Sequence, residues 1–229
     1  MSESGFRAEP PTLFLTDADV AALADWDDAI AALRAAYARP DEPTRTPERT
    51  VAVTDAGWQR ILPAAPAGGR FAGSKTIAAS LRNGLASYLI TLFDQNDARL
   101  AALIDGNRIT GIRTAATAAA ALTAMLPDRP VRVAVVGSGF EARAQLRAAS
   151  RVARITEVRV TSPTPANRER FARELGDELG LEVTATASAE EAVRGADLVL
   201  CAARSRDESP TVLAEWVAPG ATVVSIGST

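Results

Sequence analysis

The stretch VRVAVVGSGFEA, from Val131 to Ala142, decides the fold of this 229-residue chain. An apolar run typical of a β-strand stops at Gly137, and a helical pattern starts near Phe140. Gly137 permits the turn, Gly139 lets a phosphate approach the backbone, and Ala142 replaces the third glycine where helix and strand pack closely. The spacing GxGxxA therefore predicts a dinucleotide-binding turn, with the pyrophosphate at the start of a helix.

The sequence beyond this stretch alternates strand-type and helix-type patterns. Strand-type patterns at residues 131–137, 157–162, 181–186, 198–203 and 221–227 are separated by helical segments. This alternation predicts an α/β fold with an open, parallel, doubly wound sheet of the Rossmann type. The glycine turn follows the first strand of that sheet, which is where a dinucleotide fingerprint requires it.

The end of the second strand indicates which dinucleotide is bound. NAD-selective sheets place a carboxylate there for the ribose 2′-hydroxyl, but residues 160–164 read VTSPT and contain no acid. Ser162, Thr164 and Arg168 could instead donate to a 2′-phosphate. We expect NADP(H) to be favoured over NAD(H), with a solvated helix charge as the alternative interpretation of Arg168.

The first half of the chain has a different order of strand and helix patterns. An antiparallel strand pair is expected over residues 87–94 and 100–105, followed by a turn at 105–107 and an alanine-rich helix over 109–126. The segment from Pro127 to Pro130 ends that helix and marks the expected boundary. We expect an α+β substrate-binding and dimerisation domain over residues 1–127 and a Rossmann NAD(P)-binding domain over 128–229. The apolar sheet is a natural dimer face, although apolar strands also serve simply as core.

Composition excludes several kinds of function. The net charge of −3, with no basic cluster interleaved with aromatics, argues against nucleic acid as a partner. The chain has no histidine, so histidine triads and histidine metal sites are excluded, and we expect no metal. A single cysteine, Cys201, fits a reducing compartment. No leader pattern or membrane-length apolar run is present, so we expect a cytoplasmic protein without a membrane partner.

Three cations in the first half are candidates for substrate chemistry because each has small or apolar neighbours. They are Arg49 after a proline-bearing loop, Lys75 in GSKTI and Arg113 in TGIRTAA. Two arginines could bind a carboxylate bidentately, and a partly desolvated lysine could polarise or protonate a carbonyl or imine. By composition alone, each could equally be a surface cation with a buried stem.

Several of these segments together resemble the ornithine cyclodeaminase/mu-crystallin family, in order and from Leu13 onward. They include PER at 47–49, GSK at 73–75, LITLFD at 89–94, LAALIDGNRITGIRTAA at 100–116, VVGSGFEARAQLRA at 135–148 and WVAPGATVVSIGS at 216–228. The resemblance implies a homodimer whose first domain forms the subunit contact and holds substrate, and whose Rossmann domain binds NAD(P)(H). That family includes cyclodeaminases, ketimine reductases, alanine and opine-like dehydrogenases and a thyroid-hormone-binding protein.

The resemblance also implies roles for individual residues. Arg49 and Arg113 match the arginines that bind the substrate carboxylate, and Lys75 matches the catalytic lysine beside the carbon that exchanges hydride. Thr114 is expected to line the same pocket and to contact the cofactor. The pyrophosphate turn corresponds to Gly137, Ser138, Gly139, Phe140, Glu141 and Ala142.

Two departures from the family pattern matter. Cyclodeaminases carry an aspartate after the strand that ends in Ile-Gly, but on an ungapped register this chain has Thr229 there. Thr229 is therefore expected to contact substrate, as in the ketimine-reductase branch, and cyclodeamination is put in doubt. The sequence also stops several tens of residues before family members do, so we expect a C-terminally incomplete Rossmann sheet and a piece of a longer protein.

The preferred interpretation is an NAD(P)H-dependent reductase or dehydrogenase of a small α-imino or α-amino acid. A cyclodeaminase that uses NAD catalytically is the alternative enzyme. A protein of another class, which binds cofactor and ligand without turnover, also stays open.

Overall fold

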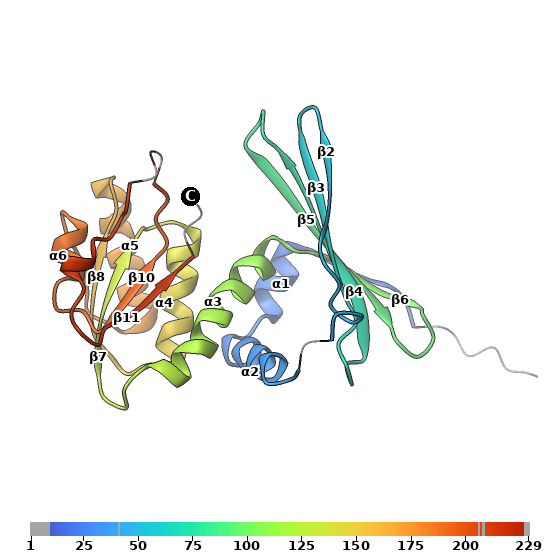
Figure 1. The fold of residues 1–229 in the computed structure, drawn as a ribbon, viewed down its shortest axis with the longest axis horizontal. Helices are drawn as coiled ribbons and strands as arrows, with labels where there is room; N and C mark the ends of the chain where they lie inside the picture. The colour runs from blue at the N-terminus through green and yellow to red at the C-terminus, as the bar shows by residue number, and fades with distance from the viewer. Residues whose placement is uncertain (1–9, 41, 206, 208, 227–229) are drawn as a thin grey trace, which may run out of the picture. The chain divides into compact units, whose positions relative to one another are not determined.

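The computed structural model describes residues 10–40, 42–205, 207 and 209–226. The chain divides into two compact units, drawn together in Figure 1. The first contains the chain up to Ala24 and Arg39–Thr110, and the second contains Asp25–Ala38 and the chain from Gly111 onward. Among the described residues, no helix is both long and apolar enough to cross a membrane.

The first unit is a six-stranded sheet in the order β1-β6-β5-β4-β3-β2. Its elements are β1 (Leu13–Leu15), α1 (Asp17–Leu23), β2 (Thr50–Thr54), β3 (Gly57–Ala64), β4 (Phe71–Ser80), β5 (Leu85–Asp94) and β6 (Leu100–Asp105). Strand β1 runs parallel to β6, and the other neighbours are antiparallel. The predicted antiparallel pair β5–β6 is confirmed.

The two faces of this sheet differ because side chains alternate along a strand. On one face, Val20 of α1 packs with Ala102 and Ile104 of β6 and with the half-buried Ile90 of β5. Lys75 of β4 lies opposite Ile90 and therefore on this same face. The other face exposes large apolar side chains: Phe14, Ile61, Leu85, Leu89 and Phe93.

The second unit is built on a five-stranded sheet in the order β11-β10-β7-β8-β9, all parallel. Its strands are β7 (Val131–Val136), β8 (Ile155–Thr161), β9 (Val183–Ala185), β10 (Leu198–Cys201) and β11 (Thr222–Ser225). Its helices are α2 (Trp26–Tyr37), α4 (Phe140–Val152), α5 (Pro165–Leu179), α6 (Ala189–Val193), the 3₁₀ turn η1 (Ala214–Trp216) and most of α3 (Asn107–Met125). From β9 to β11 the strands follow the order 3-2-1-4-5, which confirms the predicted Rossmann-type sheet.

Helices cover both faces of this sheet, as the continuous apolar strands predict. Val133 and Val135 of β7 pack on one face with Leu146 of α4 and Phe171 of α5. The intervening residues of β7 point to the other face, where they pack with Val193 of α6. The turn after β7 is thereby fixed between two packed layers.

The compact units do not divide at Pro127, where the sequence analysis expects the boundary. Ile30 of α2 and Ala115 and Ala119 of α3 pack against Ala144 and Ala148 of α4, so both helices belong with the parallel sheet. The small side chains let these helices approach closely. An interior of alanines is equally apolar on every side, so sequence periodicity does not show which unit α3 joins.

Helix α3 also begins earlier than expected, at Asn107 instead of Ile109. The Asp105 carboxylate accepts a hydrogen bond from the Asn107 amide at 2.9 Å and so satisfies one free donor of the first turn. The predicted turn is therefore shorter and the helix starts directly beside strand β5.

Candidate functional site

The glycine turn after β7 has the geometry of a phosphate cradle. Gly137 has φ +114°, and a Cβ there would lie 2.9 Å from the carbonyl oxygen of Ala202 on the neighbouring strand end. A Cβ on Gly139 would meet no heavy atom within 4 Å, so the space beside it is open. Gly139 is also the N-cap of α4 and supplies no side-chain hydrogen bond, which leaves the first amides of that helix available. A pyrophosphate fits this combination of open backbone and helix N-terminus.

The turn opens into a cleft of about 700 Å³ at the carboxyl ends of β7, β8 and β10. This is the position where strand order reverses and where open α/β sheets bind ligands. Three arginines, Arg168, Arg170 and Arg204, line the cleft, and its described lining contains no aspartate or glutamate. The cleft therefore favours a polyanion.

Hydrogen bonds join the glycine turn to the end of β8. The Ser138 hydroxyl donates to the Ser162 hydroxyl at 2.9 Å, and Arg168 Nη1 donates to the Ser162 carbonyl oxygen at 2.9 Å. Thr164 lines the same cleft. The structure thus brings together six residues that the sequence assigns to the cofactor: Gly137, Ser138, Gly139, Ser162, Thr164 and Arg168.

Three further residues line the cleft that were not predicted from the sequence: Arg170, Arg204 and Thr211. Arg204 follows β10, the strand that lies next to β7 on the side away from β8. The predicted doubly wound sheet was the available signal, because such a sheet places the end of its fourth strand beside the glycine turn.

Other assigned cofactor residues lie elsewhere on α3 and α4. Ala142 is fully buried in the core, as close packing of helix and strand requires. Phe140 packs against α3, where a Cβ on Gly111 would lie 2.3 Å from its ring. Burial raises the pKa of the Glu141 carboxyl, and the positive charge of Arg113 opposes that rise. In the described lining of the cleft, neither Phe140 nor Glu141 contributes, and Thr114 is half-buried on α3.

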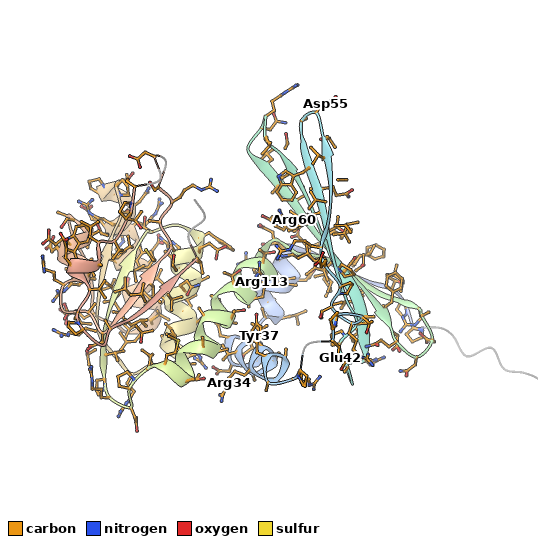
Figure 2. All side chains as sticks on the ribbon, viewed as in Figure 1. Arg34, Tyr37, Glu42, Asp55, Arg60 and Arg113 are labelled. Atoms are coloured by element: carbon orange, nitrogen blue, oxygen red, sulfur yellow. The ribbon has the colours of Figure 1, made fainter. Side chains whose placement is uncertain are left out.

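The substrate candidates are distributed over both units. Arg113 is exposed on α3 in the second unit, where Figure 2 labels it. Arg49 is exposed directly before β2 in the first unit. Thr229 lies outside the described residues.

Lys75 is half-buried on β4 in the first unit. Its Nζ donates to Thr110 Oγ1 at 3.5 Å and lies 5.9 Å from the centroid of the Tyr88 ring. It is also the only lysine in the chain, since the other 24 of the 25 basic residues are arginine. That count distinguishes Lys75 from every other basic side chain of the chain.

Comparisons with curated proteins find proteins named as reductases and as cyclodeaminases. Ketimine reductase mu-crystallin of Mus musculus is 33% identical over 140 residues, covering 61% of this chain and 42% of that protein. A Delta(1)-pyrroline-2-carboxylate reductase of Paracoccus denitrificans is 27% identical over 94% of this chain and 68% of its own length. The chain spans about two-fifths of the first curated relatives that it matches.

Solved structures share the fold over nearly the whole chain. The Thermococcus litoralis Delta(1)-pyrroline-2-carboxylate reductase, in complex with NADH and L-proline, is 25% identical with a TM-score of 0.83. It aligns with 94% of this chain and 69% of its own. An archaeal alanine dehydrogenase dimer with bound NAD is 27% identical with a TM-score of 0.81, over 93% of this chain and 66% of that one.

The family model that describes ornithine cyclodeaminases and mu-crystallins matches residues 11–229, which include both units and every described residue of the cleft. On that match, the chain belongs to the ornithine cyclodeaminase/mu-crystallin family.

Proposed function

We propose that this chain carries the NAD(P)H-dependent reduction of a small α-imino acid to the corresponding α-amino acid. Support comes from the relatives, which include a ketimine reductase, a pyrroline-2-carboxylate reductase and an iminosuccinate reductase. The glycine turn and its basic cleft provide a fitting site for the dinucleotide. The substrate class is inferred from Arg49 and Arg113, the candidates for carboxylate binding, and from Lys75, the candidate for proton transfer.

The observation that carries the proposal is the identity of the residue at position 75. Everywhere else this chain uses arginine as its basic side chain, and arginine does not give up its proton in proteins. A lysine can release a proton from Nζ, and this lysine is half-buried beside a hydroxyl and an aromatic ring. A proton donor is what the reduction of an imine requires.

The remaining roles follow from the chemistry of each side chain. Arg49 and Arg113 would bind the substrate carboxylate through paired N–H donors, with Thr114 and Thr229 lining the same site. Lys75 would supply the proton to the imine nitrogen. When bound at the glycine turn, the reduced nicotinamide supplies hydride to the adjacent carbon. Orientation of the reactants by these groups contributes much of the acceleration.

We also propose NADP(H) as the preferred cofactor. The described lining of the cleft has arginines and hydroxyls at the end of β8 and no carboxylate to repel a 2′-phosphate. Arg168 is held at that position by its hydrogen bond to the Ser162 carbonyl oxygen. Two structural relatives bind NADH or NAD. The proposed preference for NADP(H) therefore rests on the cleft residues of this chain and not on those relatives.

A dimer and a cytoplasmic location complete the proposal. The first unit's sheet has one face that packs with α1, and the opposite face is here called the outer face. The outer face exposes several large apolar side chains, which a second copy would cover. A structural relative is a dimer. The single cysteine, Cys201, is free and buried, as in proteins of reducing compartments.

The assay that tests the proposal follows NADPH and NADH absorbance with Δ1-pyrroline-2-carboxylate and Δ1-piperideine-2-carboxylate. We expect reduced cofactor to be consumed with imine and no ammonia to be released from ornithine. Ammonia release without net oxidation of cofactor would favour the cyclodeaminase, a class to which one relative with 27% identity belongs. Tight cofactor binding with neither reaction would favour a ligand-binding protein.

A further inference from the structure

The strand pairing of β4 and β5 places an aromatic ring beside Lys75. Lys75 lies opposite Ile90 and Ile77 lies opposite Tyr88, so Lys75 and Tyr88 are diagonal neighbours on one face of the sheet. The Lys75 ammonium lies 5.9 Å from the centroid of the Tyr88 ring, within the range of a cation–π contact. The ring is half-buried, which strengthens such a contact relative to an exposed one.

The turn at Gly106 lies against Tyr88, directly before the first residues of α3. The Gly106 amide donates to the Tyr88 carbonyl oxygen at 3.0 Å. A Cβ at Gly106 would lie 3.1 Å from the Tyr88 Cβ and 3.3 Å from Ile90 Cγ1, so a larger residue would need its neighbours to shift by a few tenths of an ångström. Helix α3 therefore starts close enough to β5 for its first turn to reach Lys75.

Thr110 makes the second contact to the lysine. Its hydroxyl donates to the Gly106 carbonyl oxygen at 2.7 Å, which orients its lone pairs away from that oxygen. The same hydroxyl oxygen accepts from Lys75 Nζ at 3.5 Å. Both the ring face and this oxygen interact better with an ammonium than with a neutral amine.

We propose that Tyr88 is a positioning residue, assisted by Thr110, which holds the Lys75 ammonium in place as the proton donor of the reaction. This inference rests on the proposed reductase function. In the step concerned, hydride forms a new C–H bond at the imine carbon, and the electron pair of the C=N π bond moves to nitrogen. That nitrogen takes a proton from Lys75 Nζ, while the dihydronicotinamide is oxidised to nicotinamide.

The experiment compares Tyr88→Leu, which removes the ring, with Tyr88→Phe, which keeps it. We expect Tyr88→Leu to lower kcat about tenfold, to leave KM for the imine within about twofold, and to move the alkaline limb of the pH–rate profile to lower pH. Tyr88→Phe should retain at least about a third of the wild-type kcat. Thr110→Val should show a smaller fall in kcat, which Thr110→Ser restores.

A second measurement does not depend on activity. Lysine labelled with ¹³C at Cε gives one NMR signal, because the chain has one lysine. We expect its titration midpoint to fall by about one pH unit in Tyr88→Leu, equivalent to a tenfold change in affinity for the proton, and to move little in Tyr88→Phe.

The outcomes separate the two proposals. If the wild-type chain reduces no imine but the Lys75 midpoint falls in Tyr88→Leu, the function is wrong and the contact stands. If the chain is active and Tyr88→Leu changes neither kcat nor the midpoint, Tyr88 does not position the lysine. An equal loss in Tyr88→Phe and Tyr88→Leu would also overturn the proposal, because it would assign the effect to the hydroxyl.

Discussion

Lys75→Arg separates the two properties that a lysine contributes, which are a positive charge and a proton that it can release. If the proton is what matters, the variant keeps the charge but should lose about 10²–10⁴-fold in kcat for imine reduction. The Kd for NADPH, measured by fluorescence titration, should stay within about twofold because the cleft contacts are untouched. Activity of Lys75→Arg within threefold of wild type would show that Lys75 acts only through its charge.

Arg168 tests the choice between the two dinucleotides. Arg168→Gln should raise the Kd for NADPH about tenfold, because charge-assisted hydrogen bonds to a 2′-phosphate are lost. The Kd for NADH should change less than twofold, since NADH has no phosphate at that position. Arg173→Gln is the matched control, because Arg173 is an exposed arginine of the same helix α5 outside the described cleft lining. Equal losses for both cofactors would mean that Arg168 does not read the 2′ position.

One carboxylate, that of Asp197, joins the residue before β10 to the start of β7. Asp197, just before β10, accepts from Arg129 Nη2 and from the Arg132 backbone amide, both at 2.9 Å. The pKa of Asp197 lies below its usual value, mainly because of the hydrogen bond from the Arg129 side chain and secondly because of the hydrogen bond from the Arg132 amide. Asp197 therefore stabilises the fold above the unfolded pKa of about 3.9, and that contribution is lost as pH falls through the lower folded pKa.

Asp197→Asn should accordingly lower the free energy of unfolding by about 1–2 kcal/mol at pH 7, measured by urea denaturation. The difference from wild type should shrink as pH falls below the unfolded value and through the lowered folded pKa of Asp197, because the wild-type carboxyl then also becomes protonated. Asp128→Asn is the control, because Asp128 pairs with Arg154 while fully exposed to solvent. A difference that is as large at pH 2 as at pH 7 would contradict the assigned charge effect.

The elements of the second half could be predicted from the sequence for a physical reason. VRVAVV of β7 is apolar almost without interruption because both of its faces are buried, whereas the helices repeat their apolar residues every three or four positions. The glycines that follow mark the turn between β7 and α4. The assignment of α3 could not be predicted, because its alanines satisfy packing on any side. The contact between Lys75 and Tyr88 could not be predicted either, because it depends on the register in which β4 pairs with β5.

The two faces of the first unit's sheet provide a test of the proposed dimer. Leu89 of β5 is 43% exposed on the outer face, and a glutamate there should prevent a second copy from covering the apolar patch. Leu89→Glu should convert a dimer to a monomer in light scattering after size-exclusion chromatography. Val53→Glu is the control, because Val53 is 82% exposed but lies on the opposite face, in register with Trp58 and Ala79. A wild-type monomer, or a Leu89→Glu dimer, would show that this face is not the subunit contact.

The most direct test of the central claim follows the hydride itself. The wild-type chain is incubated with [4-²H]NADPH and Δ1-pyrroline-2-carboxylate, and the amino-acid product is analysed by mass spectrometry and NMR. We predict one deuterium at the α-carbon of proline for each NADP⁺ formed, with the label transferred from the cofactor carbon that is oxidised. Proline without deuterium at that carbon, using cofactor labelled on each face in turn, or the absence of proline altogether, would contradict the assignment of this chain as an imino-acid reductase.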